Sequence, residues 1–119
     1  MIRDASVYDA PGADDGLRVL IMRYWPRGVR RERVDLWLRD AAPSADLLRA
    51  YTHDGLTWPE FETRYRAEIE TERPHVLEQL TDLEQQHETL TLLCRERNAH
   101  CHREVLSALL RKTSRNVSP

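Results

Sequence analysis

The chain has 119 residues, of which 40% are hydrophobic and 32% are charged, and its formal net charge is −2. This composition is typical of a globular protein rather than a disordered one, and the length suits one domain. The longest unbroken apolar run, Val19 to Met22, is too short to span a membrane, and Met1–Asp4 lacks the pattern of a secretory leader. With only two cysteines, we expect a soluble, cytoplasmic protein from a reducing compartment.

The net charge hides an uneven distribution of charged residues along the chain. Residues 18–33 carry six arginines against Glu32, and residues 91–119 are also net positive, whereas residues 34–90 are strongly acidic. The simplest interpretation of such charged segments is that they lie on the solvent-exposed surface. Both basic segments, however, adjoin a strand-like run, which makes them candidates for one shared anion-binding site.

The first part of the chain predicts two strands. Residues 2–8 form a weak β pattern, and residues 17–24 contain a continuous apolar run that indicates burial on both faces of a sheet. Between them, residues 9–16 are rich in Pro, Gly and Asp, which is typical of a loop. Because this loop is shorter than the usual parallel crossover, we expect the two strands to pair in antiparallel fashion.

Helical spacing of apolar residues follows in the middle of the chain. A short helix is expected over residues 32–40, and a second begins after Ser44, which can cap it. A third begins at Thr57, where Glu60 completes a capping box and Trp58, Phe61 and Tyr65 mark the buried face. Pro74 is expected to open a fourth helix.

A last strand over residues 89–94 and a last helix over residues 99–112 complete the expected elements. They predict a small α/β domain over residues 1–112 and a flexible tail over residues 113–119. The expected sheet is short and mostly parallel, with about three strands and an antiparallel edge, covered by about five helices. The strands at 17–24 and 89–94 should be parallel, so their carboxyl ends should open onto one crevice.

The first candidate site follows the strand at 17–24. Arg23 and Arg27 carry guanidinium groups that bind carboxylate or phosphate oxygens, and Trp25 can stack on a planar ligand. Pro26 and Gly28 direct the backbone and would let its amides approach a ligand. The alternative is that Trp25 plugs an edge of the core while the arginines pair with acidic residues.

The second candidate site follows the strand at 89–94. We expect Asn98 to cap the last helix, so that the positive end of that helix and nearby basic groups lower the pKa of Cys101. Cys94 and Cys101 fit four alternatives: a reactive or ligand-contacting thiol, an inert buried pair, a metal site with a histidine, or a disulfide. Six intervening residues differ from the usual zinc spacing, so no metal ligand is assigned.

Two other features have simpler interpretations. His53 and Asp54 adjoin one another in a loop and are best explained as a surface turn, while Glu96 is the better acid–base candidate because it lies at the expected crevice mouth. The simplest interpretation of the aromatic residues Trp58, Phe61 and Tyr65 is that they belong to the hydrophobic core.

These residues give the chain a resemblance to a known family. The motif residues are Arg18 to Gly28, Trp37-Leu38, Ala42-Pro43-Ser44, His53-Asp54, Trp58, Phe61, Tyr65 and Glu68. Over roughly residues 2–110, the chain resembles the family catalogued as domain of unknown function 488, in particular its YeaO-like branch. The resemblance implies a compact α/β fold in bacteria and assigns no reaction.

The end of the chain differs from that branch in one motif. Cys94, Glu96 and Cys101-His102-Arg103 are similar to a Cys-x-Glu…Cys-His-Arg pattern of the wider family. The YeaO-like branch usually ends its last strand with Tyr-Ala and lacks this cysteine pair.

We hypothesise a protein with an anion-binding crevice, and an enzyme acting on a phosphorylated or nucleotide-like ligand is one form of this hypothesis. The expected ligand-binding residues are Arg23, Trp25, Arg27, Gly28, Cys94 and Arg103. The expected catalytic residues are Glu96, Cys101 and His102. One alternative is a nucleic-acid or regulatory binding protein, which the acidic net charge disfavours. Another is a Cys/His metal-binding or redox-sensing protein. The cofactor and the oligomeric state are left unspecified.

Overall fold

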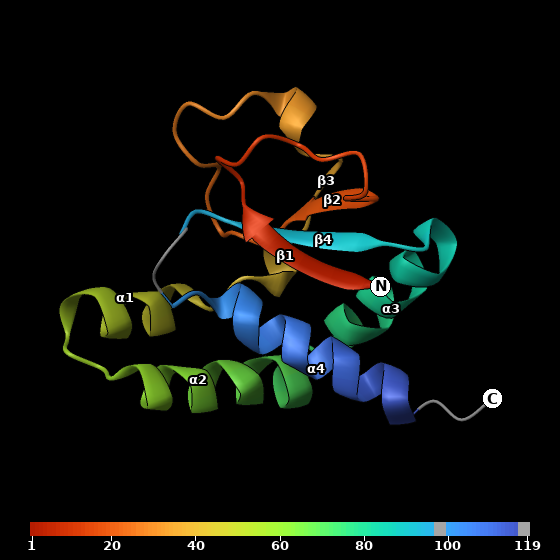
Figure 1. The fold of residues 1–119 in the computed structure, drawn as a ribbon. Helices are drawn as coiled ribbons and strands as arrows, with labels where there is room; N and C mark the ends of the chain where they lie inside the picture. The colour runs from red at the N-terminus through yellow and green to blue at the C-terminus, as the bar shows by residue number, and fades with distance from the viewer. Residues whose placement is uncertain (97–99, 117–119) are drawn as a thin grey trace.

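The computed structural model describes residues 1–96 and 100–116 and has an α/β fold (Figure 1). Its four strands are β1 (Ile2–Ser6), β2 (Leu17–Leu20), β3 (Leu36–Trp37) and β4 (Leu90–Cys94). Its four α-helices are α1 (Ala45–His53), α2 (Trp58–Ala67), α3 (Pro74–His87) and α4 (His102–Asn116). The strands form one sheet in the order β1-β4-β2-β3, and every pairing is parallel. Within the described ranges, no helix combines the length and apolar character needed to cross a bilayer.

The helices begin where the sequence predicts capping residues. The Ser44 hydroxyl accepts a hydrogen bond from the backbone N–H of Leu47 at 3.1 Å and starts α1. Thr57 and Glu60 form the expected capping box of α2, which continues into a π-helical turn over Glu68–Glu72. Pro74 opens α3 at a position where its missing N–H costs little.

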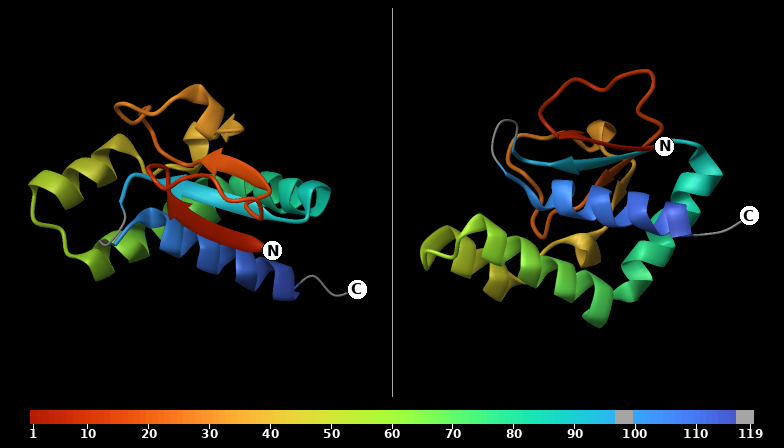
Figure 2. Two further views of the ribbon diagram at one scale, coloured as in Figure 1. Left: turned by 45° about the horizontal axis from the view of Figure 1, so that its top comes forward. Right: turned by 60° about the horizontal axis from the view of Figure 1, so that its bottom comes forward.

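The sheet separates two hydrophobic cores because its side chains alternate between the faces. Val19 and Ile21 point into the larger core, which the helices cover, and Leu20 points into a smaller core on the opposite face. Figures 1 and 2 show the four α-helices on one side of the sheet and the segments 7–16 and 21–34 over the other. The predicted burial of β2 on both faces is therefore confirmed.

The expected antiparallel edge is wrong. β1 and β2 do not pair with each other, because β4 lies between them and pairs in parallel with both. The loop over residues 7–16 runs along the face of the sheet opposite the α-helices, from the end of β1 to the start of β2. Ten extended residues can span roughly 33 Å, about twice the length of a five-residue strand, so no helix is needed in this crossover.

The expected helix over residues 32–40 is also wrong. Two 3-10 turns, Arg31–Arg33 and Arg39–Ala41, flank the short strand β3 instead. The backbone N–H of Leu38 donates to the Leu20 carbonyl at 2.9 Å, so this segment satisfies the edge of β2. Pairing with β2 replaces intrahelical hydrogen bonds, and the described part of the chain therefore has four α-helices rather than about five.

The last helix differs from its expected limits at both ends. α4 begins at His102 and continues to Asn116, past the expected end at residue 112. The backbone N–H of Glu104 donates to the Cys101 carbonyl at 3.0 Å, so Cys101 lies just before the helix rather than inside it. The expected cap, Asn98, lies outside the described residues.

A buried ion pair fastens the loop over residues 7–16 to β2. The Arg18 guanidinium donates to the Asp15 carboxylate, and both side chains are buried. Burial alone would raise the pKa of Asp15, but the backbone N–H of Gly12 and the charge of Arg18 outweigh it and lower the pKa. The ionised form of Asp15 is therefore favoured in the folded protein.

We predict that Asp15→Asn lowers the free energy of unfolding by about 3–5 kcal/mol at pH 7, because it leaves a buried guanidinium without its counter-charge. Glu62→Gln, which breaks the exposed Arg66–Glu62 pair, should cost at most about 1 kcal/mol. Urea unfolding monitored by circular dichroism measures both values. Similar losses in the two variants would contradict the structural role of the buried pair.

The effect of Asp15→Asn should also depend on pH. Because the folded-state pKa of Asp15 is lowered, its stabilisation is fully present above the unfolded pKa, near the ordinary value of 3.8. That stabilisation is lost as the pH falls through the lower folded-state pKa. The stability gap between the wild type and Asp15→Asn should therefore narrow below pH 3.8.

Candidate functional site

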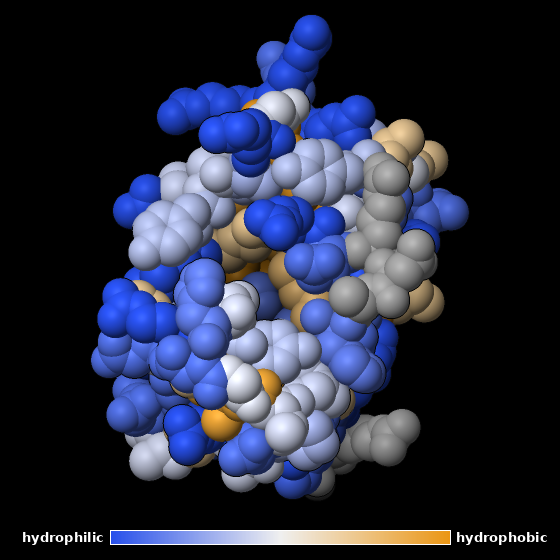
Figure 3. Space-filling view, turned by 90° about the vertical axis from the view of Figure 1, so that its left-hand side faces the viewer, coloured by the Kyte–Doolittle hydropathy of each residue, from blue (hydrophilic) through white to orange (hydrophobic). Residues whose placement is uncertain are grey.

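A pocket of about 230 Å³ lies at the carboxyl ends of β2 and β4, where it faces α1 and α2. Figure 3 shows this end of the molecule, with a hollow that has an apolar floor and polar groups around its rim. The walls include the aromatic residues Tyr24, Tyr51, Trp58 and Phe61. The remaining polar, charged and sulfur-containing residues are Met22, Arg23, Thr52, Cys94, Arg95, Glu96, His100, Cys101 and His102.

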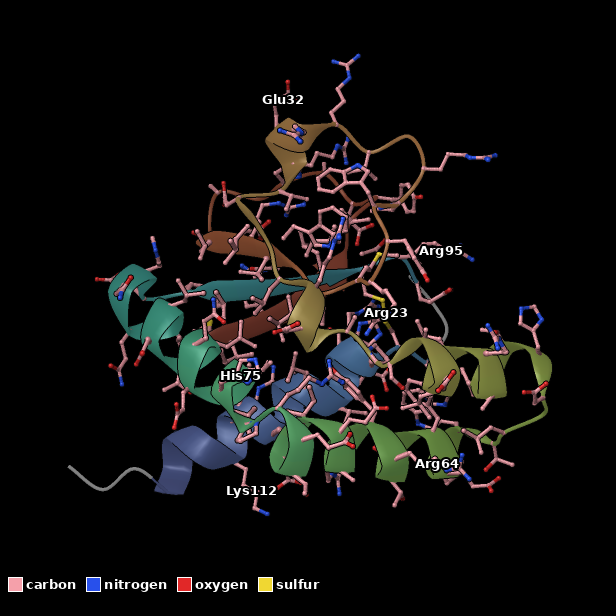
Figure 4. The ribbon with its side chains drawn as sticks, turned by 180° about the vertical axis from the view of Figure 1, so that it is seen from behind. Arg23, Glu32, Arg64, His75, Arg95 and Lys112 are labelled. Atoms are coloured by element: carbon pink, nitrogen blue, oxygen red, sulfur yellow. A yellow bond between two sulfur atoms is a disulfide. The ribbon has the colours of Figure 1, made fainter. Side chains whose placement is uncertain are left out.

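The parallel register of β2 and β4 creates this pocket. Leu20 pairs with Leu93, and the backbone N–H of Ile21 donates to the Leu93 carbonyl at 3.1 Å. Both chains therefore leave the sheet at the same edge. Arg23 follows β2 and Arg95 follows β4, and Figure 4 shows the two arginines on the same side of the molecule beside the disulfide. The two basic segments meet at this edge, as the sequence predicts.

His102, the first residue of α4, lies at the inner end of the pocket and is 8% exposed. Its Nε2 lies 2.5 Å from the carbonyl oxygen of Ile21, a distance that assigns the ring proton to Nε2. Its Nδ1 faces the sulfur atoms of Cys101 and Cys94 at 3.6 and 3.9 Å. Burial lowers the pKa of His102 to about 4, so the ring is neutral near pH 7 and Nδ1 keeps its lone pair.

Cys94 and Cys101 are bonded to each other as a disulfide, and both are buried. Of the four alternatives that the sequence left open, the structure therefore contains the disulfide. Cys94 ends β4, and Cys101 precedes α4, so the bond joins the end of β4 to the start of α4 at the pocket. This bond engages both sulfur atoms, and neither is a free thiol in this form.

Arg103 is buried and does not occur among the described lining residues of the pocket. Its guanidinium donates to the backbone carbonyl of Glu96, and its Nε lies 3.5 Å from an Asp4 carboxylate oxygen. The Arg103 side chain is buried, and its hydrogen bond positions the backbone of the pocket residue Glu96. We interpret Arg103 as a positioning residue, where the sequence suggested a ligand-binding role.

The structure places three other expected ligand-binding residues away from this pocket. Trp25 packs edge-on against Trp37 with 5.4 Å between ring centroids, and its Nε1 donates to the Val29 carbonyl at 2.9 Å. This matches the alternative in which Trp25 plugs an edge of the core. Arg27 is exposed, and Gly28 adopts a positive φ of 79° in the same loop. Among the described lining residues, none of these three occurs.

Arg23 is held in place at the pocket by its own hydrogen bond. Its Nε donates to the Pro43 carbonyl at 3.0 Å, which fixes the guanidinium between the end of β2 and the start of α1. Arg95 is more exposed and lies 3.8 Å, Nε to Oε1, from the Glu96 carboxylate. The pocket therefore combines one anchored cation with a more exposed ion pair.

Sequence reasoning missed the aromatic wall of the pocket. Phe61 and Tyr65 are buried as expected, but Trp58 lies at the first position of α2 and lines the pocket. The His100 ring stacks on Trp58 with 4.5 Å between centroids and 9° between planes. The position of Trp58 at the helix end was the available signal, because helix ends point toward the edge of a core. His53 is exposed, but it is the last residue of α1 rather than part of a loop, and only Asp54 lies in the turn that follows.

The comparisons with known proteins place this pocket in a family context. The chain matches the family model DUF488-N3a, described as the active DUF488-N3 subclade, over residues 2–114. It is 43% identical over 70 residues to the uncharacterized protein Rv3073c of Mycobacterium tuberculosis (strain ATCC 25618 / H37Rv), an alignment that covers 57% of this chain and 59% of the relative. The uncharacterized protein YeaO of Escherichia coli (strain K12) is 34% identical over 65 residues, which cover 53% and 56% of the two chains.

The matched part spans less than two thirds of the length of these curated relatives. No solved structure matches this chain. The family model nevertheless covers nearly all of the described structure, including β2, β4 and the start of α4, which form the pocket. The chain belongs to the DUF488 family, in its YeaO-like group and its active DUF488-N3 subclade.

Proposed function

We propose that this protein is an enzyme whose pocket at the ends of β2 and β4 binds a small phosphorylated or nucleotide-like molecule. The observation that carries the proposal is the combination of guanidinium groups and aromatic walls in one concave site. Guanidinium groups bind phosphate oxygens through paired N–H donors, and aromatic rings stack on planar groups. The protein's acidic net charge gives no general attraction for anions, so the attraction arises locally.

The size of the pocket limits the ligand. Its volume of about 230 Å³ is below the range of roughly 300–1,000 Å³ that is typical of drug-sized ligand sites. A sugar phosphate or one half of a nucleotide fits such a site better than a dinucleotide. We propose that Arg23 and Arg95 hold the anionic group while Trp58 and Tyr51 contact the apolar or planar part.

Glu96 is the proposed acid–base group. Glu96 lines the pocket next to Arg95. The Arg103 guanidinium donates a hydrogen bond to the backbone carbonyl of Glu96, which positions the backbone that carries the carboxylate. Its side chain is about two fifths exposed, which leaves it accessible to a bound ligand and to water. A carboxylate within reach of a reacting group can accept or donate a proton.

Adenosine 5′-monophosphate is a suitable probe, because it carries both a phosphate and a planar base. We expect isothermal titration to detect binding of this nucleotide and weaker binding of inorganic phosphate and of adenosine. Arg23→Gln should reduce the affinity for the nucleotide at least tenfold, because a charge-assisted hydrogen bond contributes about 1.5–3 kcal/mol. The glutamine amide can still donate to the Pro43 carbonyl, which protects the local fold.

Arg64→Ala is the matched control, since Arg64 is exposed on α2 and is not among the lining residues described for this pocket (Figure 4). Its affinity for the nucleotide should equal that of the wild type. If the nucleotide, ribose 5-phosphate and phosphate all fail to bind, or if Arg23→Gln and Arg64→Ala bind equally well, the proposed function is wrong.

A further inference from the structure

We infer that the reduced protein holds one thiophilic divalent metal ion, of the zinc class, between Cys94 Sγ, Cys101 Sγ and His102 Nδ1. These three atoms lie within 4.8 Å of one another at the inner end of the pocket, and all three residues are buried. The proposal concerns the metal site alone and does not depend on the identity of the pocket's ligand. Binding of a metal without binding of the nucleotide would reject only the proposed function, and the reverse result would reject only the metal site.

The distances fit a metal centre. Tetrahedral zinc has Zn–S distances of about 2.3 Å and Zn–N distances of about 2.0–2.1 Å, which place its ligand atoms roughly 3.5–3.8 Å apart. The two distances from His102 Nδ1 to sulfur, 3.6 and 3.9 Å, already lie near that range. Only the two sulfur atoms must separate. The Cα atoms of Cys94 and Cys101 are 7.1 Å apart, beyond the usual 4.4–6.8 Å of a disulfide, so the backbone leaves room for that separation.

The hydrogen bond of His102 to the main chain also favours a metal ligand. The Nε2–H group donates to the Ile21 carbonyl at 2.5 Å, which aims the Nδ1 lone pair at the two sulfur atoms. Histidines that bind metals usually donate their other ring N–H to a carboxylate or a backbone carbonyl in this way. The edge-on contact with Tyr65, at 5.5 Å between centroids, further limits rotation of the ring.

The number of protein ligands in this cluster is typical of a catalytic zinc site rather than of a structural zinc site. Structural zinc sites have four protein ligands, whereas catalytic sites keep three and leave one position for water or substrate. Among the described residues, three groups form this cluster, and all three line the pocket. The fourth position would therefore face the cavity that also contains Arg23 and Glu96.

Loading the metal requires a balanced change at the sulfur atoms. A dithiol reductant transfers two electrons and two protons to the Cys94–Cys101 bond, which breaks to give two thiols while the reductant becomes a disulfide. Metal binding then releases the two thiol protons to solvent and leaves two thiolates on the ion. The disulfide form described here and the metal form are two exclusive states of the same pair of cysteines.

Cobalt(II) is the direct probe, because a four-coordinate thiolate site gives visible d–d bands and a near-ultraviolet sulfur-to-metal charge-transfer band. Titration of the full-length protein, reduced in an anaerobic chamber, should reach an end point near one cobalt per chain. Zinc should then displace the cobalt and remove the bands. Protein kept in the disulfide form should give no charge-transfer band.

His102→Gln should weaken cobalt binding at least tenfold, and Cys94→Ser should remove most of the charge-transfer band. His75→Gln is the matched control, because His75 is an exposed histidine at the start of α3 (Figure 4). Circular dichroism checks that each variant folds. If His102→Gln fails to fold, the zinc X-ray absorption spectrum of the wild type decides, with two sulfur ligands and at least one nitrogen ligand expected.

The proposal is overturned if the reduced wild type shows no charge-transfer band with stoichiometric cobalt. It is also overturned if His102→Gln and His75→Gln bind cobalt equally well, or if the zinc spectrum contains no sulfur ligands. In each of those cases, Cys94 and Cys101 form a disulfide that serves the fold alone.

Discussion

The hydrogen bond from His102 to the Ile21 carbonyl is the interaction on which the candidate site depends. It joins the first residue of α4 to the residue that follows β2, at 2.5 Å. The other ring nitrogen, Nδ1, faces the sulfur atoms of Cys94 and Cys101, and Cys94 is the last residue of β4. One imidazole therefore connects three segments that are far apart in the chain. Because the ring is buried and neutral, it can fill this position without the cost of burying a charge.

The parallel sheet explains why these segments meet. β4 lies at the centre of the described sheet and pairs with β1 and β2, so the chain leaves β2 and β4 at a common edge. The helices cover one face of the sheet, and α1 and α2 supply the aromatic wall of the pocket at that edge (Figure 1). Loops and a second small core cover the opposite face and contain Trp25. Two sets of residues, the arginine side chains and the Cys-Cys-His cluster, therefore line one concave surface.

Much of this arrangement could be predicted from local sequence. Capping residues specified the starts of α1 and α2, and the apolar run of β2 specified a strand buried on both faces. Long-range pairing decided the features that were predicted wrongly. Residues 32–40 have helical periodicity, but Leu36 and Trp37 pair with the edge of β2 and form the strand β3 instead. The strand order was also hidden, because nothing near β1 or β2 in the sequence reveals that β4 inserts between them. Arg23 lines the pocket, whereas Trp25 packs against Trp37 in the second core on the other face of the sheet.

The protonation of His102 tests the central claim most directly. Long-range proton–nitrogen NMR correlations on uniformly ¹⁵N-labelled protein report which ring nitrogen carries the proton. The structure predicts that His102 carries it on Nε2 and remains neutral between pH 5 and 8, since burial lowers its pKa to about 4. A proton on Nδ1, or a titration near the ordinary value of 6.5, would contradict the account, because the lone pair would then not face the sulfur atoms.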